Sequence, residues 1–200
     1  MISIFEAANG CPRARRSTIV ATSWIFVVAG ILALVYAVYA TIEGDTYQAV
    51  EIRRFEYFKP PPPRLLVEGD VIGEIKVARL GLKAIVVQGD SSRVLRHAVG
   101  HLSQTALPGE TGNVALAAHR DTLFRPLRDI RLGDIVTFDI PGQQFRYQVD
   151  STLVVSPSES DVLQPSTARK LTLITCFPFG YIGPAPNRFV VHAHEIVSSP

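Results

Sequence analysis

Hydrophobic residues are arranged in three different ways along this chain. Residues 18–42 contain no charged side chain, and residues 24–39 are apolar almost throughout. Residues 43–58 mix apolar and charged side chains at spacings that fit a short amphipathic helix. From residue 64 onward, short runs rich in Val, Ile, Thr, Phe and Leu are separated by Gly, Pro, Asp and Ser. The pattern predicts a membrane-spanning helix, a short helical segment and a β-rich domain.

The apolar run over 18–42 has the length of a transmembrane anchor, since such a helix crosses a hydrocarbon core about 30 Å thick. Arg13, Arg15 and Arg16 precede it, whereas Glu43 and Asp45 follow it. Because basic residues stay on the cytoplasmic side, residues 1–17 are expected in the cytoplasm and the remaining chain outside the cell membrane. The lipid bilayer is thus one expected partner of a single-pass protein.

A cleavable signal peptide is the alternative interpretation of this segment, because it shares the basic start and the apolar middle. The apolar run exceeds the usual signal core of about 7–15 residues, and no clear cleavage motif precedes a polar stretch. Ala37 and Ala40 keep the alternative open. We favour the retained anchor.

The segment between anchor and domain is predicted to act as a spacer over residues 43–63. Residues 60–63 are four consecutive prolines, which form a stiff, extended polyproline stretch. The β-rich domain is therefore expected to occupy residues 64–200. Its runs predict an all-β sandwich or closed barrel with strands over 72–77, 82–87, 113–119, 135–138, 144–155, 170–176 and 189–196. Short helical turns are expected over 123–130 and 161–163.

Composition narrows the functional classes. The net charge is only +2 and the basic residues are spread along the chain, so nucleic acid is not an expected partner. The sequence has two cysteines, Cys11 and Cys176, on opposite sides of the predicted anchor. They cannot pair there, so neither a disulfide framework nor a four-thiolate zinc site is expected.

Three residues at predicted strand ends carry the candidate chemistry. Cys176 ends the run 170–176, in which alternation places it on one face with Thr172 and Ile174. His119 ends the apolar run 113–119, and Arg188 opens the last one. Taken singly, these are as well explained by packing, a surface imidazole and a strand-end charge. Together they supply the nucleophile, proton carrier and oxyanion stabiliser of a cysteine acyl transferase.

These segments resemble the sortase family. Residues 172–176, Thr-Leu-Ile-Thr-Cys, resemble the TLxTC signature, while His119 and Arg188 resemble the other two catalytic positions in the same chain order. The likeness covers about residues 64–193, and its loops are most similar to class D sortases. It implies an eight-stranded β-barrel, a cytoplasmic N-terminus and cleavage of an LPxTG-like sorting motif after Thr through a Cys thioester. The implied partners are surface proteins bearing that motif and an amine acceptor on the cell envelope or a pilin.

Further residues are weaker candidates. Thr175, Thr172 and His101 are expected to shape the substrate site, and no cofactor or metal is expected. His192 and His194 lack an evident third ligand. Calcium, which some sortases bind, would need acidic residues closer together than the scattered Glu110, Asp134, Asp139 and Asp161.

Other functions remain open at this point. A hydrolase on the same fold would resolve the thioester with water, and no residue separates it from a transpeptidase. A noncatalytic membrane-tethered assembly module is disfavoured because all three catalytic residue types are present. Papain-like chemistry fits less well because that family places Cys before His.

Overall fold

The computed structural model describes residues 24–39, 48–50, 52 and 66–196. The chain divides into two compact units, Met1–Glu43 and Gly44–Pro200. In the first unit, residues 24–39 form one helix with exposed side chains. Within the described residues, no helix has both the length and the apolar character that a membrane crossing requires. The remainder of the anchor predicted over 18–42 lies outside them, as do residues 60–63 of the predicted spacer.

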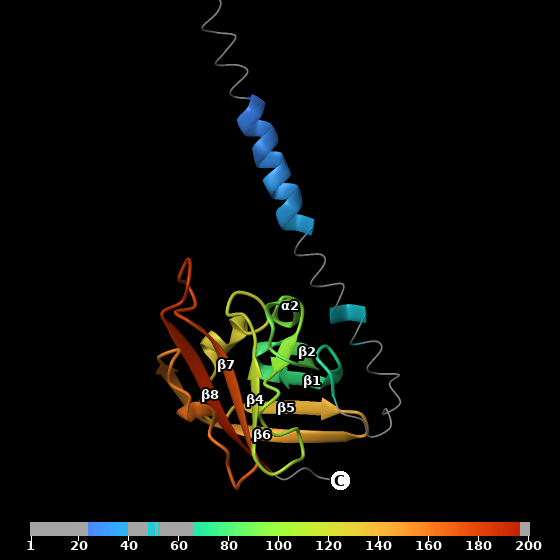
Figure 1. Ribbon diagram of the computed structural model, residues 1–200, viewed down its shortest axis with the longest axis vertical. Helices are drawn as coiled ribbons and strands as arrows, with labels where there is room; N and C mark the ends of the chain where they lie inside the picture. Colours follow the sequence, from blue (N-terminus) through green and yellow to red (C-terminus); the bar gives the residue numbers. More distant parts are fainter. Residues whose placement is uncertain (1–23, 40–47, 51, 53–65, 197–200) are drawn as a thin grey trace, which may run out of the picture. The chain divides into compact units, whose positions relative to one another are not determined.

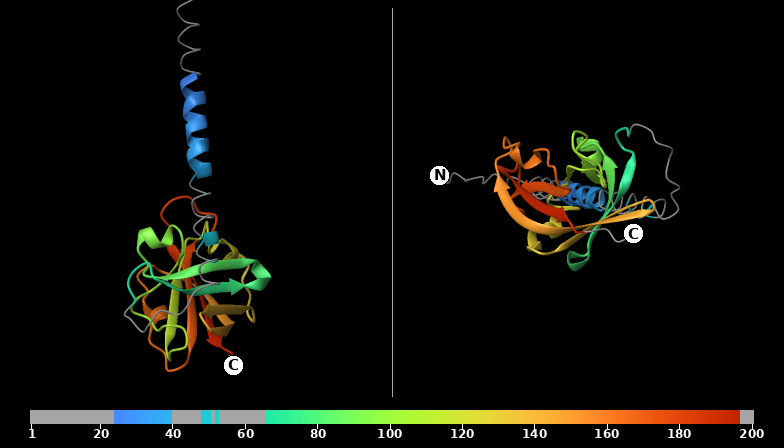
Figure 2. Two further views of the ribbon diagram at one scale, coloured as in Figure 1. Left: turned by 90° about the vertical axis from the view of Figure 1, so that its right-hand side faces the viewer. Right: turned by 90° about the horizontal axis from the view of Figure 1, so that it is seen from below.

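The second unit contains a closed barrel with the strand order β1-β2-β3-β4-β7-β8-β6-β5 (Figures 1 and 2). Its eight strands are β1 (Val71–Val77), β2 (Leu82–Gln88), β3 (Val99–His101), β4 (Asn113–Ala117), β5 (Ile135–Ile140), β6 (Gln143–Val155), β7 (Lys170–Phe177) and β8 (Asn187–Glu195). Neighbours pair antiparallel except β2–β3 and β4–β7, which are parallel. The expected all-β barrel is confirmed.

Short helices connect the strands. They are η1 (Ala78–Leu80), α2 (Ser92–Leu95), η2 (Arg125–Asp129) and η3 (Asp161–Leu163). The helical turns expected over 123–130 and 161–163 are confirmed as η2 and η3. The strands predicted from the sequence do not include β3, because a three-residue strand is too short to show an alternating pattern.

Alternation along the strands separates the barrel core from its outer face. On β7, Leu171 and Leu173 belong to the buried core cluster, as do Val191 and Ala193 on β8. Since successive side chains of a strand point to opposite faces, Cys176 belongs with Thr172 and Ile174 on the outer face.

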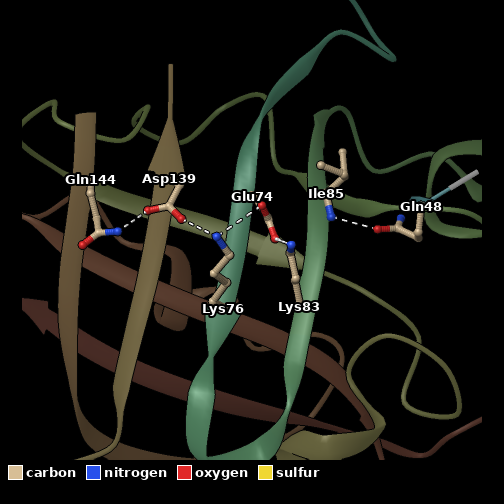
Figure 3. A network of polar contacts seen from close by, with 7 residues as sticks. All are labelled: Gln48, Glu74, Lys76, Lys83, Ile85, Asp139 and Gln144. Atoms are coloured by element: carbon tan, nitrogen blue, oxygen red, sulfur yellow. Dashed lines mark hydrogen bonds and ion pairs between the residues drawn. The ribbon is translucent and has the colours of Figure 1, made fainter. Parts of the chain in front are cut away.

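A polar network crosses four strands on another part of the outer face (Figure 3). Glu74 of β1 is buried and forms ion pairs with Lys76 at 3.3 Å and Lys83 of β2 at 3.2 Å. Lys76 also donates to Asp139 of β5 at 2.7 Å, and Asp139 accepts a second bond from Gln144 of β6 at 2.7 Å. A buried carboxylate needs such partners to offset the loss of hydration. The network links β2, β1, β5 and β6 in their order around the barrel.

The segment before the barrel contacts its outer face. The Gln48 side chain accepts a hydrogen bond from the Ile85 backbone N–H at 2.9 Å (Figure 3) and donates to the His97 carbonyl. Ile52 packs against a small hydrophobic cluster formed by Ile85, Val87, Val94 and Ala98. Residues 48 and 52 are helical and belong to the same compact unit as the barrel.

Candidate active site

Cys176 lies one residue before the end of β7 and its side chain is partly exposed. Both neighbours of β7 are paired strands, β4 on one side and β8 on the other (Figure 1). The thiol is therefore carried by a strand that is hydrogen-bonded on both sides, which fixes the backbone position of Cys176. It is free in the structure.

Arg188 lies directly opposite Cys176 in the antiparallel register of β7 and β8. Directly opposite residues in such a pair have Cβ atoms about 4.5–5.5 Å apart, on the same face of the sheet. The Arg188 Nη1 donates to the Asn187 carbonyl at 3.1 Å and lies 3.5 Å from that of Ala185. No carboxylate pairs with Arg188 among the described residues. Other guanidinium donors thus stay available to an oxygen near the thiol.

His119 follows the end of β4 by two residues. The parallel register pairs Ala117 with Ile174, and the Ala118 N–H donates to the Ile174 carbonyl at 3.3 Å. Ala118 faces the core, so alternation places the exposed His119 on the outer face, level with Cys176. The structure thus brings His119, Cys176 and Arg188 to the same end of three adjacent strands, with the thiol in the middle.

The two threonines expected in the substrate site are buried. Thr175 donates its hydroxyl hydrogen to the Ala118 carbonyl at 2.7 Å, which ties the end of β7 to the residue before His119. Thr172 donates to Asn113 Oδ1 at 2.7 Å and lies 3.0 Å from His192 Nδ1. Both side chains are placed to hold neighbouring groups, and direct substrate contact stays a prediction.

His101, the third residue expected to shape the substrate site, ends β3 and is buried. Its Nδ1 lies 2.9 Å from the Gln88 side-chain oxygen, and its Nε2 lies 2.9 Å from the Ala106 carbonyl. Burial lowers the pKa of His101 below its ordinary value, although the Ala106 carbonyl and Glu110 act in the opposite direction. The imidazole therefore serves as an internal link between β2, β3 and the segment that follows.

His192 on β8 is part-buried beside Thr172. Burial is the main cause that lowers its pKa, and the positive charge of Lys170 adds to the effect. Since Thr172 gives its hydrogen to Asn113, the bond to His192 requires a proton on Nδ1 of the imidazole. The Asn113 amide in turn donates to the Val162 carbonyl at 3.2 Å.

Comparison with known proteins identifies this arrangement. The sequence profile of the sortase domain matches residues 75–196. This chain belongs to the sortase family. Sortase D of Bacillus subtilis is 27% identical over 129 residues, which cover 64% of this chain and 65% of that protein. Sortase SrtE1 of Streptomyces coelicolor is 28% identical over 180 residues, which cover 77% of this chain and 51% of that protein. The chain thus spans less than two thirds of the length of these relatives.

Solved structures agree with the family assignment. A Clostridium perfringens Sortase D5 transpeptidase superposes with a TM-score of 0.64 at 26% identity, over 77% of this chain and 98% of that one. Sortase A from Corynebacterium diphtheriae gives 0.61 at 31% identity, over 65% of this chain and 62% of that one. The likeness to class D sortases expected from the sequence is confirmed.

Arg120 is a residue of this sortase site that the sequence reasoning did not single out. It directly follows His119, and its Nη2 donates to the backbone carbonyls of Tyr181 at 2.7 Å and Gly183 at 3.0 Å. Both carbonyls belong to the connection between β7 and β8. In the sequence, only its position next to His119 points to Arg120, and that position does not predict contacts with residues some sixty positions away.

A pocket of about 450 Å³ opens beside the paired strands of the sortase barrel. Its lining comes from the segment after β2, the segment after β3 and the connection between β6 and β7, with Asp90, Leu102, Ser103, Gln104, Thr105, Leu163 and Pro165. One lining residue, Thr105, shows where the pocket lies along β7. Its hydroxyl accepts a hydrogen bond from the Ala115 N–H at 3.1 Å, and Ala115 pairs with Thr172, so the pocket lies at the height of Thr172. Among the described residues, no three His, Cys, Asp or Glu side chains are grouped to hold a metal ion.

Proposed function

We propose that this sortase is a membrane-anchored cysteine transpeptidase that cleaves an LPxTG-like sorting motif after Thr and transfers the acyl group to an amine. The observation that carries the proposal is the alignment of His119, Cys176 and Arg188 on one face, at one end of β4, β7 and β8. Family membership supports the same chemistry.

In the proposed first step, the Cys176 thiol passes its proton to the His119 imidazole, and the resulting thiolate attacks the carbonyl carbon of the motif's Thr. As the C–S bond forms, negative charge develops on the carbonyl oxygen, and the free donors of Arg188 lie beside the thiol to stabilise it. The C–N bond then breaks, and His119 supplies the proton that the departing amine requires. The product is a thioester on Cys176.

In the second step, a primary amine attacks the thioester carbonyl. The new amide bond forms, the C–S bond breaks, and the proton lost by the amine returns to the imidazole of His119. The imidazole then returns this proton to the released sulfur, and the enzyme ends in its starting state. The acceptor class proposed is an amine of the cell envelope or of a pilin lysine.

The geometry of the pocket suits the acyl side of such a motif. Thr172, level with the pocket, precedes Cys176 by four positions on β7, and four strand residues span about 13 Å. In an extended peptide, the motif's first residue lies three steps, about 10 Å, before its Thr, which is one step short of that length. A peptide with its Thr at Cys176 would therefore place its first, apolar residue near Leu102, Leu163 and Pro165.

The anchor and orientation belong to the proposal as well. The uncharged stretch over 18–42, with Arg13, Arg15 and Arg16 before it and Glu43 after it, supports an N-terminus in the cytoplasm and a barrel outside. Surface proteins that carry a sorting motif would then meet the enzyme on its own side of the membrane.

A peptide assay separates transpeptidation from the alternatives. The chain is incubated with an LPxTG-like peptide with and without triglycine, and products are resolved by mass spectrometry. We expect an acyl–triglycine product that disappears in Cys176→Ala and His119→Ala. Cys11→Ala and His194→Ala are matched controls, since Cys11 is the other cysteine of the chain and His194 is an exposed histidine paired with Asp150.

Each outcome of that assay decides between functions. A free peptide acid as the sole product, even with triglycine present, would identify a hydrolase on the same fold. No cleavage of any LPxTG-like peptide, or full activity in His119→Ala, would contradict the proposed mechanism.

A further inference from the structure

We propose that Arg120 is a positioning residue that fixes the β7–β8 connection against the chain segment carrying His119. This connection joins Phe177, which follows Cys176, to Asn187, which precedes Arg188. The inference rests on the proposed function, because it assigns Arg120 a role in admitting the peptide to that site.

The contacts of Arg120 are directed at the middle of the connection. One nitrogen, Nη2, donates to both the Tyr181 and the Gly183 carbonyls, and the guanidinium carbon lies 5.8 Å from the centre of the Tyr181 ring. Hydrogen bonds from a charged donor are stronger than neutral ones, and the cation–π contact adds to them. Arg120 thus contacts this loop through both backbone and side chain.

The loop has little else to hold its middle in place. Ile182 is 96% exposed, and Tyr181 is largely exposed as well. Within residues 180–184, the bonds from Arg120 are the only long-range hydrogen bonds that the described residues provide, beside a short-range bond from the Tyr181 N–H to the Pro178 carbonyl. The position of this segment therefore depends on the guanidinium.

Arg120 differs from a solvated surface arginine. It is half-buried, and no carboxylate among the described residues pairs with it. Its Nη1 is buried with no acceptor in the described part of the chain. Withdrawing a guanidinium from water without a carboxylate is unfavourable, so the two loop carbonyls and the Tyr181 ring are what this side chain is placed to hold.

The strand ladder and Arg120 hold different parts of the site, and this decides how the loss of Arg120 would affect the reaction. Cys176 and Arg188 are paired across β7 and β8, so their separation does not depend on Arg120. The loop between them, in contrast, is bonded to Arg120, the residue that follows His119. Loss of Arg120 should leave the thiol itself reactive while this loop shifts, which impairs docking of the peptide and its attack by Cys176.

The test compares Arg120→Met with Arg125→Met, which removes the same charged group from an exposed position on η2. The readouts are the second-order rate of Cys176 acylation by an LPxTG-like peptide, the rate of Cys176 alkylation by iodoacetamide, and hydrogen exchange over residues 178–186. For Arg120→Met we expect acylation to fall about ten- to hundredfold, exchange in the loop to rise, and alkylation to stay within about twofold of wild type. Arg120→Lys, which retains one donor group, should recover part of the acylation rate.

The outcomes separate this inference from the proposed function. If wild type forms no peptide adduct, the proposed function fails. If wild type forms it and Arg120→Met acylates at the wild-type rate, or if Arg125→Met loses as much, the role of Arg120 is overturned. A parallel fall in alkylation would also overturn it, because the thiol would then be displaced. Should Arg120→Met not fold, Arg120→Lys and Tyr181→Ala are measured in the same way.

Discussion

The Cys176 thiol lies between two neighbours that differ in how they are held. Arg188 is its direct partner in a strand ladder, whereas His119 lies beyond the last paired residue of β4 and is exposed. Thr175 restrains the chain next to His119, because its hydroxyl donates a hydrogen bond to the Ala118 carbonyl. The position of the proposed anion stabiliser, Arg188, is thus set by secondary structure, and that of the proposed proton carrier, His119, by a side-chain hydrogen bond.

Replacing Arg188 by Lys tests the first of these positions. Lysine keeps the charge but loses the planar set of donors, so we expect kcat to fall by about 10²–10³-fold, the usual effect of removing one oxyanion donor. Steady-state cleavage of an LPxTG-like peptide measures it. The melting temperature should change little because Arg188 pairs with no carboxylate in the described chain. Unchanged kcat would exclude Arg188 from the reaction.

His101, which is buried, and His192, which is part-buried, predict a dependence of stability on pH. The pKa of His101 and that of His192 are lowered in the folded state, so the unfolded chain binds protons more readily. Their contribution to stability is complete above the unfolded pKa of about 6.5 and is lost as pH falls below it. Urea unfolding at pH 7.5 and pH 5.5 should show a smaller pH effect in His101→Gln than in wild type. A pH effect in His101→Gln as large as that in wild type would contradict the assignment.

At the scale of elements, a chain of buried polar groups connects β8, β7, β4 and the turn η3. It runs from His192 to Thr172 and on to Asn113, whose amide donates to the Val162 carbonyl. Leu163, the next residue, lines the pocket near the proposed peptide path. Thr172 is thus placed to influence the substrate through the β6–β7 connection.

Replacing Thr172 by Val tests this link. Valine has nearly the same shape but leaves the Asn113 oxygen and the His192 N–H without their partner, which costs about 1–3 kcal/mol of unfolding free energy. We also expect faster hydrogen exchange over residues 161–165. Thr172→Ser should preserve both properties, and Thr152→Val on the exposed part of β6 serves as the matched control. If Thr172→Val exchanges like wild type, the β6–β7 connection is held by other contacts.

The elements differ in how far the sequence could predict them. The positions of Cys176, His119 and Arg188 at or near strand ends follow from local alternation and from breaks in the pattern, such as the one that begins at Phe177. The parallel pairing of β4 with β7 joins segments more than fifty residues apart, and local pattern carries no information on it. For the same reason the burial of His101 and the contacts of Arg120 depend on the assembled fold.

For the whole molecule, the segment before the barrel is a structural part of the second unit. Gln48 satisfies the Ile85 N–H and the His97 carbonyl, and Ile52 covers apolar side chains of β2 and α2. The catalytic domain was predicted to start at residue 64, while the compact unit begins at Gly44. A proline spacer does not show which residues before it contact the domain after it.

Gln48→Ala should therefore lower the unfolding free energy of the whole chain, by about 1–3 kcal/mol for two backbone groups left unsatisfied. Urea unfolding monitored by far-UV circular dichroism measures this free energy. Gln143→Ala, which removes an exposed amide from β6, is the control. Equal stability of Gln48→Ala and wild type would show that the segment adds nothing to the domain.

The central claim is that Cys176 forms a thioester with the Thr of a sorting motif. Its most direct test is the intact mass of the protein after brief incubation with an LPxTG-like peptide at a pH low enough to slow thioester hydrolysis. The account predicts a mass increase equal to the acyl fragment ending in Thr, which maps to the peptide containing Cys176 and is released by hydroxylamine. An adduct that persists in Cys176→Ala, or peptide cleavage in wild type with no such adduct on Cys176, would contradict it.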